Sequence, residues 1–196
     1  KADLVIDGLR FVGNDNVKGI KFTDAVHYGT LINSYITGVV DYAVCDAGTS
    51  TEGIYVGNCY LEGNVMFNKE SGIAQYNTIK GNVNVMKDFG LVAMNVISSD
   101  ITVSDVQSTF VTKNEVAESI NFTNGNACAI VENTATQITV SGGTKCIVED
   151  NNGAGEENKP VASVIVDTEG TEHYGSNVYD QSVREEYGTN QDLLPK

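Results

Sequence analysis

Acidic side chains that could work as a catalytic pair gather in one stretch of this chain, residues 20–62. Glycoside hydrolysis needs two carboxyl groups that flank one bond, roughly 5–9.5 Å apart. The same residue types more often serve as solvated or paired surface groups, so both interpretations stand for each of them. The candidate catalytic acids are Asp24, Asp41, Asp46 and Glu52, and Glu62 is a further acid in the same stretch.

Aromatic side chains that could hold a sugar ring lie in the same stretch. Ordinary surface packing is the alternative role for each Tyr. Because acids, aromatic side chains and inserted loops coincide in residues 20–62, we predict that a functional site lies there. The predicted substrate-binding residues are His27, Tyr28, Tyr42 and Tyr55, accompanied by Tyr35 and Tyr60.

Other kinds of site find little support in the sequence. Four Cys occur without a C-x-x-C pair and only two His accompany them, so we expect no metal site and no cofactor. No phosphate-binding loop or Ser-His-Asp signature appears. A net charge of -14 argues against nucleic acid and anionic membranes as partners. No apolar run reaches the roughly 18 residues of a membrane span, so we expect no membrane insertion.

The elements that must position the candidate residues follow from an internal repeat. Asn recurs at positions 58, 77, 95, 114, 133 and 151, so that successive members of the column are nearly evenly spaced. Asp7 and Asn33 extend this column upstream at a longer spacing. Asn side chains at equivalent turns of a coil can hydrogen-bond along its axis, so we predict an Asn ladder.

Apolar columns accompany the Asn column. One lies four positions before each Asn, and we expect it to fill the interior: Ile54, Ile73, Leu91, Phe110, Ala129 and Ile147. A second is an apolar-polar-apolar triplet typical of a strand with one buried face, beginning at Val65, Val83, Ile101, Ile120 and Ile138. Upstream, Ile20-Lys21-Phe22 and Val40-Asp41-Tyr42 match the triplet, which makes Lys21 and Asp41 a cross-strand charge pair.

A period of 18–19 residues with short strands predicts an all-β fold, a single-stranded parallel β-helix (solenoid), over residues 1–151. Its turns have 18–26 residues, and the longer ones carry inserted loops near 14–18 and 45–52. No six-residue period emerges, which favours the right-handed form. Residues 152–196 hold one further strand at 161–167 and an irregular remainder that is a strap, a linker or a subunit-contact segment.

Two side-chain pairs follow from the same spacing. Glu62 and Lys80 lie one period apart, so we expect a surface ion pair of little energetic consequence. Cys128 and Cys146 also lie one period apart. They are either two stacked buried thiols or a disulfide between neighbouring turns, and the dihedral that a disulfide requires is hard to meet there.

Three segments resemble rungs of the pectin-lyase-like right-handed β-helix superfamily, most of all the shaft of bacteriophage tailspike or neck-appendage proteins. They are LVIDGLRFVGND, LINSYITG and GIYVGNCYLEGNV, and the resemblance covers about residues 4–150. It implies a homotrimeric spike in the virion tail, outside the cell, that recognises a bacterial surface glycan. The superfamily has no common motif for catalytic acids, so it assigns no residue here.

Three functions remain open at this point. The first is a rigid tailspike shaft that recognises a bacterial surface polysaccharide. The second is a glycan depolymerase, either a glycoside hydrolase or a polysaccharide lyase, that works through carboxylates on the β-helix surface. The third is the passenger domain of a bacterial adhesin.

Overall fold

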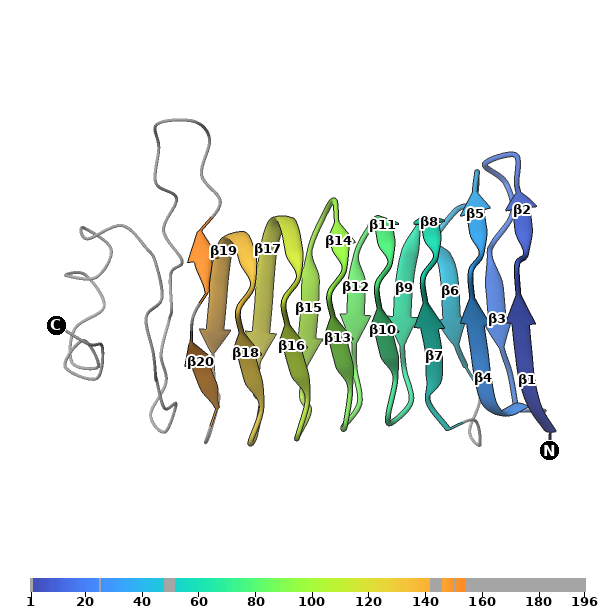
Figure 1. Cartoon of the computed structure of the whole chain (residues 1–196). Coiled ribbons are helices and arrows are strands. Elements are labelled where there is room, and N and C mark those ends of the chain that lie inside the picture. Colours follow the sequence, from blue (N-terminus) through green and yellow to red (C-terminus); the bar gives the residue numbers. More distant parts are fainter. Residues whose placement is uncertain (1, 25, 48–51, 142–145, 150, 154–196) are drawn as a thin grey trace, which may run out of the picture.

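The computed structural model describes residues 2–24, 26–47, 52–141, 146–149 and 151–153. Within these ranges the chain contains strands and turns and no helix, and the strands coil into a parallel β-solenoid (Figure 1). The predicted fold class is therefore confirmed, and it is consistent with the pectin-lyase-like fold. The handedness stays a prediction. The predicted strand at 161–167 and the C-terminal strap lie outside the described residues.

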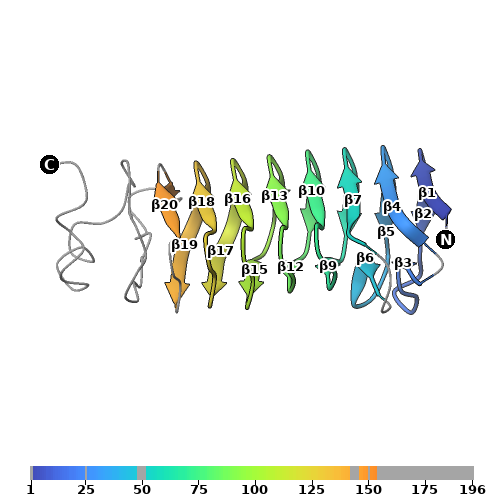
Figure 2. The same ribbon diagram turned by 90° about the horizontal axis from the view of Figure 1, so that it is seen from below.

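One face of the solenoid, which we call sheet A, stacks eight parallel strands in a straight row (Figure 2). Each strand pairs with its equivalent one turn earlier and one turn later. In order along the axis they are β1 (Ala2–Asp7), β4 (Val26–Ile32), β7 (Ile54–Gly57), β10 (Ile73–Gln75), β13 (Leu91–Ala93), β16 (Phe110–Thr112), β18 (Ala129–Val131) and β20 (Ile147–Glu149).

The second sheet has thirteen strands and forms the other two sides of each turn. Its first side holds β2 (Arg10–Val12), β5 (Tyr35–Thr37), β8 (Tyr60–Glu62), β11 (Thr78–Lys80) and β14 (Val96–Ile97). Its other side holds β3 (Ile20–Phe22), β6 (Tyr42–Asp46), β9 (Asn64–Phe67), β12 (Val83–Val85) and β15 (Ile101–Ser104). The two sides join through the longer β17 (Glu115–Thr123) and β19 (Thr134–Ser141), and β21 (Asn152–Gly153) pairs with β19.

The interior is filled by columns of like residues, as the triplet pattern predicts. Val65, Val83 and Ile101 are paired in register, and all three are fully buried. The column two positions further on runs through Phe67 and Val85 and is equally buried. Parallel strands stack about 4.7–4.9 Å apart, so each core side chain lies on its equivalent in the next turn.

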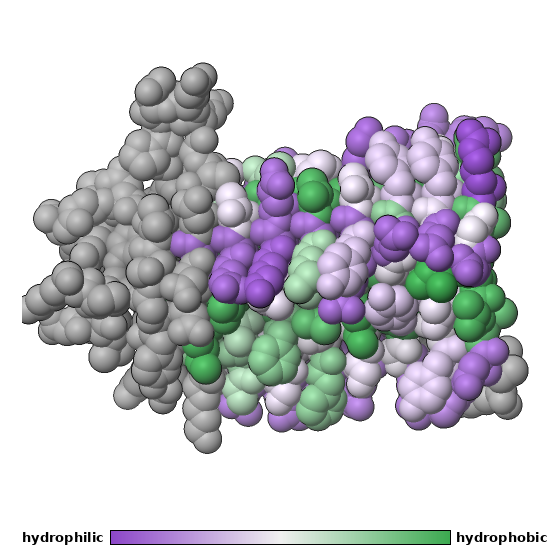
Figure 3. Space-filling model, in the orientation of Figure 1, coloured by the Kyte–Doolittle hydropathy of each residue, from purple (hydrophilic) through white to green (hydrophobic). Residues whose placement is uncertain are grey.

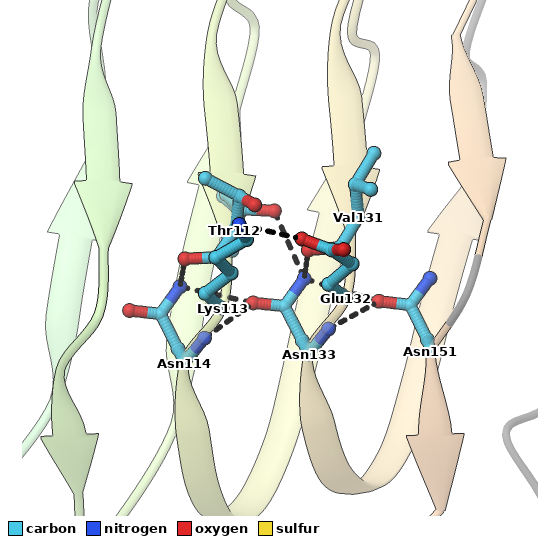
Figure 4. A network of polar contacts seen from close by, with 8 residues as sticks. Thr112, Lys113, Asn114, Val131, Glu132, Asn133 and Asn151 are labelled. Carbon is cyan, nitrogen blue, oxygen red and sulfur yellow. Dashed lines mark hydrogen bonds and ion pairs between the residues drawn. The ribbon is translucent and has the colours of Figure 1, made fainter.

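The Asn ladder is confirmed over residues 77–151 and is buried. The side chains of Asn77, Asn95, Asn114, Asn133 and Asn151 are all at most 2% exposed. The Nδ2 of each of the first four donates to the Oδ1 of the next Asn, with distances of 2.9–3.1 Å (Figure 4). Its other hydrogen goes to a carbonyl of sheet A, for example from Asn114 to Val92 O at 2.9 Å.

The assignment of Asn58 to this buried column is wrong. Gln75 pairs with Gly57, so Cys59 lies level with Asn77 and Asn58 lies one position outside the column. Asn58 is exposed, and its Nδ2 donates to Asn33 Oδ1 at 2.7 Å. Asn33 Nδ2 donates in turn to Asp7 Oδ1 at 2.9 Å, so a second, exposed ladder runs toward the N-terminus. Asn33 and Asn58 occupy a left-handed turn with φ near +50°, a conformation that Asn tolerates well.

Two further register predictions are also wrong. From Ile73 onward, the apolar column four positions before each Asn faces outward, because Phe110 is 49% exposed whereas the following residue, Val111, is fully buried. Ile54 is buried as predicted, because Tyr55 and not Ile54 pairs with Ile73. The triplet at residues 20–22 pairs with residues 44–46 and not with 40–42, because residues 39–41 form a turn in which Asp41 has φ +63°. Asp41 therefore meets Lys18, with Nζ and Oδ2 2.6 Å apart, and not Lys21.

The stacking of two cysteines is confirmed. Ala129 pairs with Ile147, so Cys128 and Cys146 lie level on neighbouring turns, and both are buried free thiols. A hydrogen bond with Cys146, together with burial, raises the pKa of the Cys128 thiol. Such thiols behave as small apolar core residues, the first of the two interpretations.

The described residues include no helix long and apolar enough to cross a membrane.

Candidate functional site

Three of the predicted site residues meet on the first turns of sheet A. His27 Nε2 lies 3.3 Å from Glu52 Oε1, and His27 Nδ1 lies 3.5 Å from Asp3 Oδ1. The ring of Tyr28 contacts the imidazole edge to face, with 4.3 Å between centroids and 69° between planes. We call Asp3, His27, Tyr28 and Glu52 the His27 cluster.

The stacking of successive turns brings the His27 cluster together. His27 lies in β4, and Glu52 N donates to His27 O at 3.1 Å, which places Glu52 on the next turn just before β7. Asp3 lies in β1 on the preceding turn, where the pairing of β1 with β4 shifts register between Ala2 and Leu4. Sequence reasoning missed Asp3, although Asp3 precedes His27 by nearly the same interval that separates His27 from Glu52.

The cluster is open to solvent and strongly polar. The side chains of His27, Glu52 and Asp3 are 41%, 54% and 70% exposed. A hydrogen bond to Glu52 and the charge of that carboxylate raise the pKa of the Tyr28 hydroxyl. The Tyr28 hydroxyl therefore donates a hydrogen bond to the Glu52 carboxylate. Both imidazole nitrogens face carboxylate oxygens. The cluster presents groups that can hydrogen-bond to the hydroxyl groups of a bound molecule.

Asp46, another predicted catalytic acid, lies in the core. Phe22 pairs with Asp46 and Phe67 follows one turn later, so the carboxyl occupies an inward column between two aromatic rings. Asp46 is fully buried, its Oδ1 accepts from Asn68 N at 2.5 Å, and its Oδ2 has no hydrogen-bond partner. Burial raises the pKa of Asp46 to about 6. This carboxyl does not face solvent beside the His27 cluster.

The remaining candidate acids lie away from core positions. Asp24 is exposed in the turn after β3. Asp41 is held by Lys18, whose Nζ also lies 5.7 Å from the centre of the Tyr42 ring.

Tyr55 is half-buried on the outer face of β7. Its hydroxyl would lie 2.5 Å from a side-chain carbon at position 57, which explains the Gly at that position.

Tyr35 and Tyr60 form an aromatic stack on the outer face of β5 and β8. Their ring centroids are 4.9 Å apart with 10° between planes. Arg10 covers the far face of Tyr35 at 5.7 Å, and Lys80 covers that of Tyr60 at 5.4 Å. Their faces are therefore occupied by neighbours, which favours the packing interpretation over sugar stacking. The predicted ion pair of Lys80 with Glu62 is confirmed at 3.5 Å.

Within the part of the chain that the structure describes, no group of three or more His, Cys, Asp or Glu side chains could hold a metal ion. Comparison with known proteins gives no match to a family model, to a curated protein or to a solved structure.

Proposed function

We propose that this chain is a rigid β-helical shaft of a phage tailspike or appendage that recognises a bacterial surface polysaccharide. The observation that carries the proposal is the unbroken stacking of sheet A over eight strands, joined by the buried Asn ladder. A solenoid in which every turn contacts only its neighbours is an extended scaffold, and such scaffolds present long binding surfaces. This proposal places the protein in the virion tail, outside the cell.

The His27 cluster is where we place the polysaccharide contact. A rigid scaffold fixes the relative positions of binding residues, and here β4 presents His27 and Tyr28 while β1 presents Asp3. Glu52 lies in the segment just before β7. Its Tyr hydroxyl, carboxylates and imidazole are exposed groups that match the hydroxyls of a sugar. A neutral or cationic glycan would suit it better than an acidic one, because two carboxylates flank the imidazole.

Replacing His27 with Ala should weaken polysaccharide binding about tenfold, the loss of one or two hydrogen bonds of roughly 1 kcal/mol each. Isothermal titration of the full chain with purified capsule or lipopolysaccharide of candidate hosts measures this effect. Glu118→Gln is the matched control, because Glu118 is an exposed acid on β17 in the regular half of the solenoid. Equal affinity of the His27 variant and the unaltered chain would contradict the placement of the contact.

Depolymerase activity is the second candidate, and the two carboxylates that contact one imidazole favour it. A hydrolase would release new reducing ends, and a lyase would release unsaturated sugars that absorb in the ultraviolet. Incubation of the polysaccharide that binds with the full chain distinguishes these outcomes, and Glu52→Gln should lower either rate at least a hundredfold. Measurable binding without any product would contradict the enzyme and leave the shaft.

The homotrimer implied by the resemblance stays a prediction. A mass of three copies in solution would support it, and a mass of two copies would contradict it.

A further inference from the structure

An apolar column runs along the outer face of sheet A. We call it the apolar stripe, and its members pair in register from turn to turn: Ile73, Leu91, Phe110, Ala129 and Ile147. Phe110 is 49% exposed, and the other four are half-buried. Figure 3 shows the hydrophobic side chains gathered over β13, β16 and β18, below a band of hydrophilic ones.

The stripe is unusual because the chain is so acidic. The molecule carries a net charge of -14, yet the column from Tyr55 to Ile147 contains no charged side chain. Single exposed apolar residues are ordinary, whereas a contiguous apolar patch with a polar border marks a contact surface. A second copy of this equally acidic chain meets the least electrostatic repulsion if it approaches along the stripe.

The spacing of the stripe makes it complementary to itself. Consider a two-fold axis that runs parallel to the strands, midway between β16 and β18. This rotation lays sheet A of one copy on sheet A of the other, with the two solenoid axes antiparallel. Phe110 then faces Ala129 of the second copy, a large side chain opposite a small one, and Leu91 faces Ile147. An interface of this kind repeats each contact twice.

The same rotation also matches charges. Lys113 and Glu132 lie beside the stripe on neighbouring turns, with Nζ and Oε2 3.1 Å apart and side chains 51% and 47% exposed (Figure 4). A two-fold axis between β16 and β18 places Lys113 of one copy opposite Glu132 of the other. By symmetry, two oppositely charged pairs then face each other across the interface. If the two solenoid axes ran parallel, Lys113 and Glu132 of the two copies would not be paired in this way.

We propose that two copies of this chain associate face to face through the apolar stripe, antiparallel, about a two-fold axis between β16 and β18. The proposal does not rest on the polysaccharide-binding function. The facing rungs from β13 to β20 span only about three spacings of 4.8 Å, which is small for a stable complex, so the pair is weak and transient.

Sedimentation of the full chain from about 10 µM to about 1 mM tests the association, a range suited to weak complexes. We expect the average mass to rise toward two copies. Phe110→Glu should raise the dissociation constant at least tenfold, because each interface would bury two unpaired charges. Val96→Glu is the matched control: Val96 is also 49% exposed but lies in β14, away from the stripe, and should leave the association unchanged.

Charge exchange tests the antiparallel geometry. Lys113→Glu and Glu132→Lys should each raise the dissociation constant about three- to tenfold, because each places like charges opposite one another. The double exchange should restore the original value. A monomer at all concentrations, a mass of three copies, or a double exchange as weak as the single ones would each overturn the proposal. Thermal unfolding of each variant confirms that the solenoid is intact.

Discussion

Replacing Asn114 with Ala should lower the free energy of unfolding by about 3–5 kcal/mol. The Oδ1 of Asn114 accepts from the backbone N and the Nδ2 of Asn95 at 3.1 and 3.0 Å. Its Nδ2 donates to Val92 O and to Asn133 Oδ1, both at 2.9 Å. Ala leaves several of these buried groups without partners, and each one costs about 1–3 kcal/mol. Urea unfolding followed by circular dichroism measures the change.

Asn58→Gly is the control for this prediction. Asn58 lies in the exposed ladder, where water replaces its lost hydrogen bond, and Gly accepts its φ of +52° without strain. We expect a loss below about 1 kcal/mol, the range of surface substitutions. Similar losses at the two positions would show that burial does not set the strength of the ladder.

The repeat predicted the fold because a parallel solenoid stacks equivalent residues, so that one hydrogen-bonding or apolar type recurs at a fixed spacing. The repeat did not identify the ladder positions at which a residue other than Asn makes the hydrogen bonds. Ser34 lies level with Cys59 and Asn77; its Oγ donates to Ile32 O at 2.7 Å and accepts from Leu9 N at 3.1 Å. Cys59 Sγ donates to Gly57 O at 3.2 Å. The spacing pattern selects Asn58 instead, because the interval from Asn58 to Asn77 matches the other intervals of the Asn column.

The site was predictable to the extent that it follows the spacing of the long turns. His27 and Glu52 have the same separation in the sequence as Asn33 and Asn58, so they share a face of the solenoid. Their roles in binding or catalysis stay predictions. Asp46 shows the limit of this reasoning. The length of the turn at 39–41 sets which side of β6 faces inward, and no composition rule places an acid between two core Phe side chains.

Protonation of Asp46 should make the protein more stable in mild acid than it would be if only its other carboxylates titrated. Burial raises its pKa from 3.8 to about 6, so the folded chain binds this proton more tightly than the unfolded chain. The penalty for the buried charge is fully present above pH 6 and disappears as the pH falls toward 4. A difference of about two pKa units corresponds to about 3 kcal/mol.

Asp46→Asn isolates this contribution, because the amide cannot titrate and every other acid remains. Urea unfolding at pH 7.5 and pH 4.5 should show the unaltered chain gaining about 2 kcal/mol relative to the variant, because pH 4.5 lies between the two pKa values and realises most of the full difference. Parallel changes in the two proteins would mean that the pKa of Asp46 is the same in the folded and the unfolded chain. The unpaired Oδ2 gives the physical reason to expect the gain: a proton on that atom removes the charge that no donor there compensates.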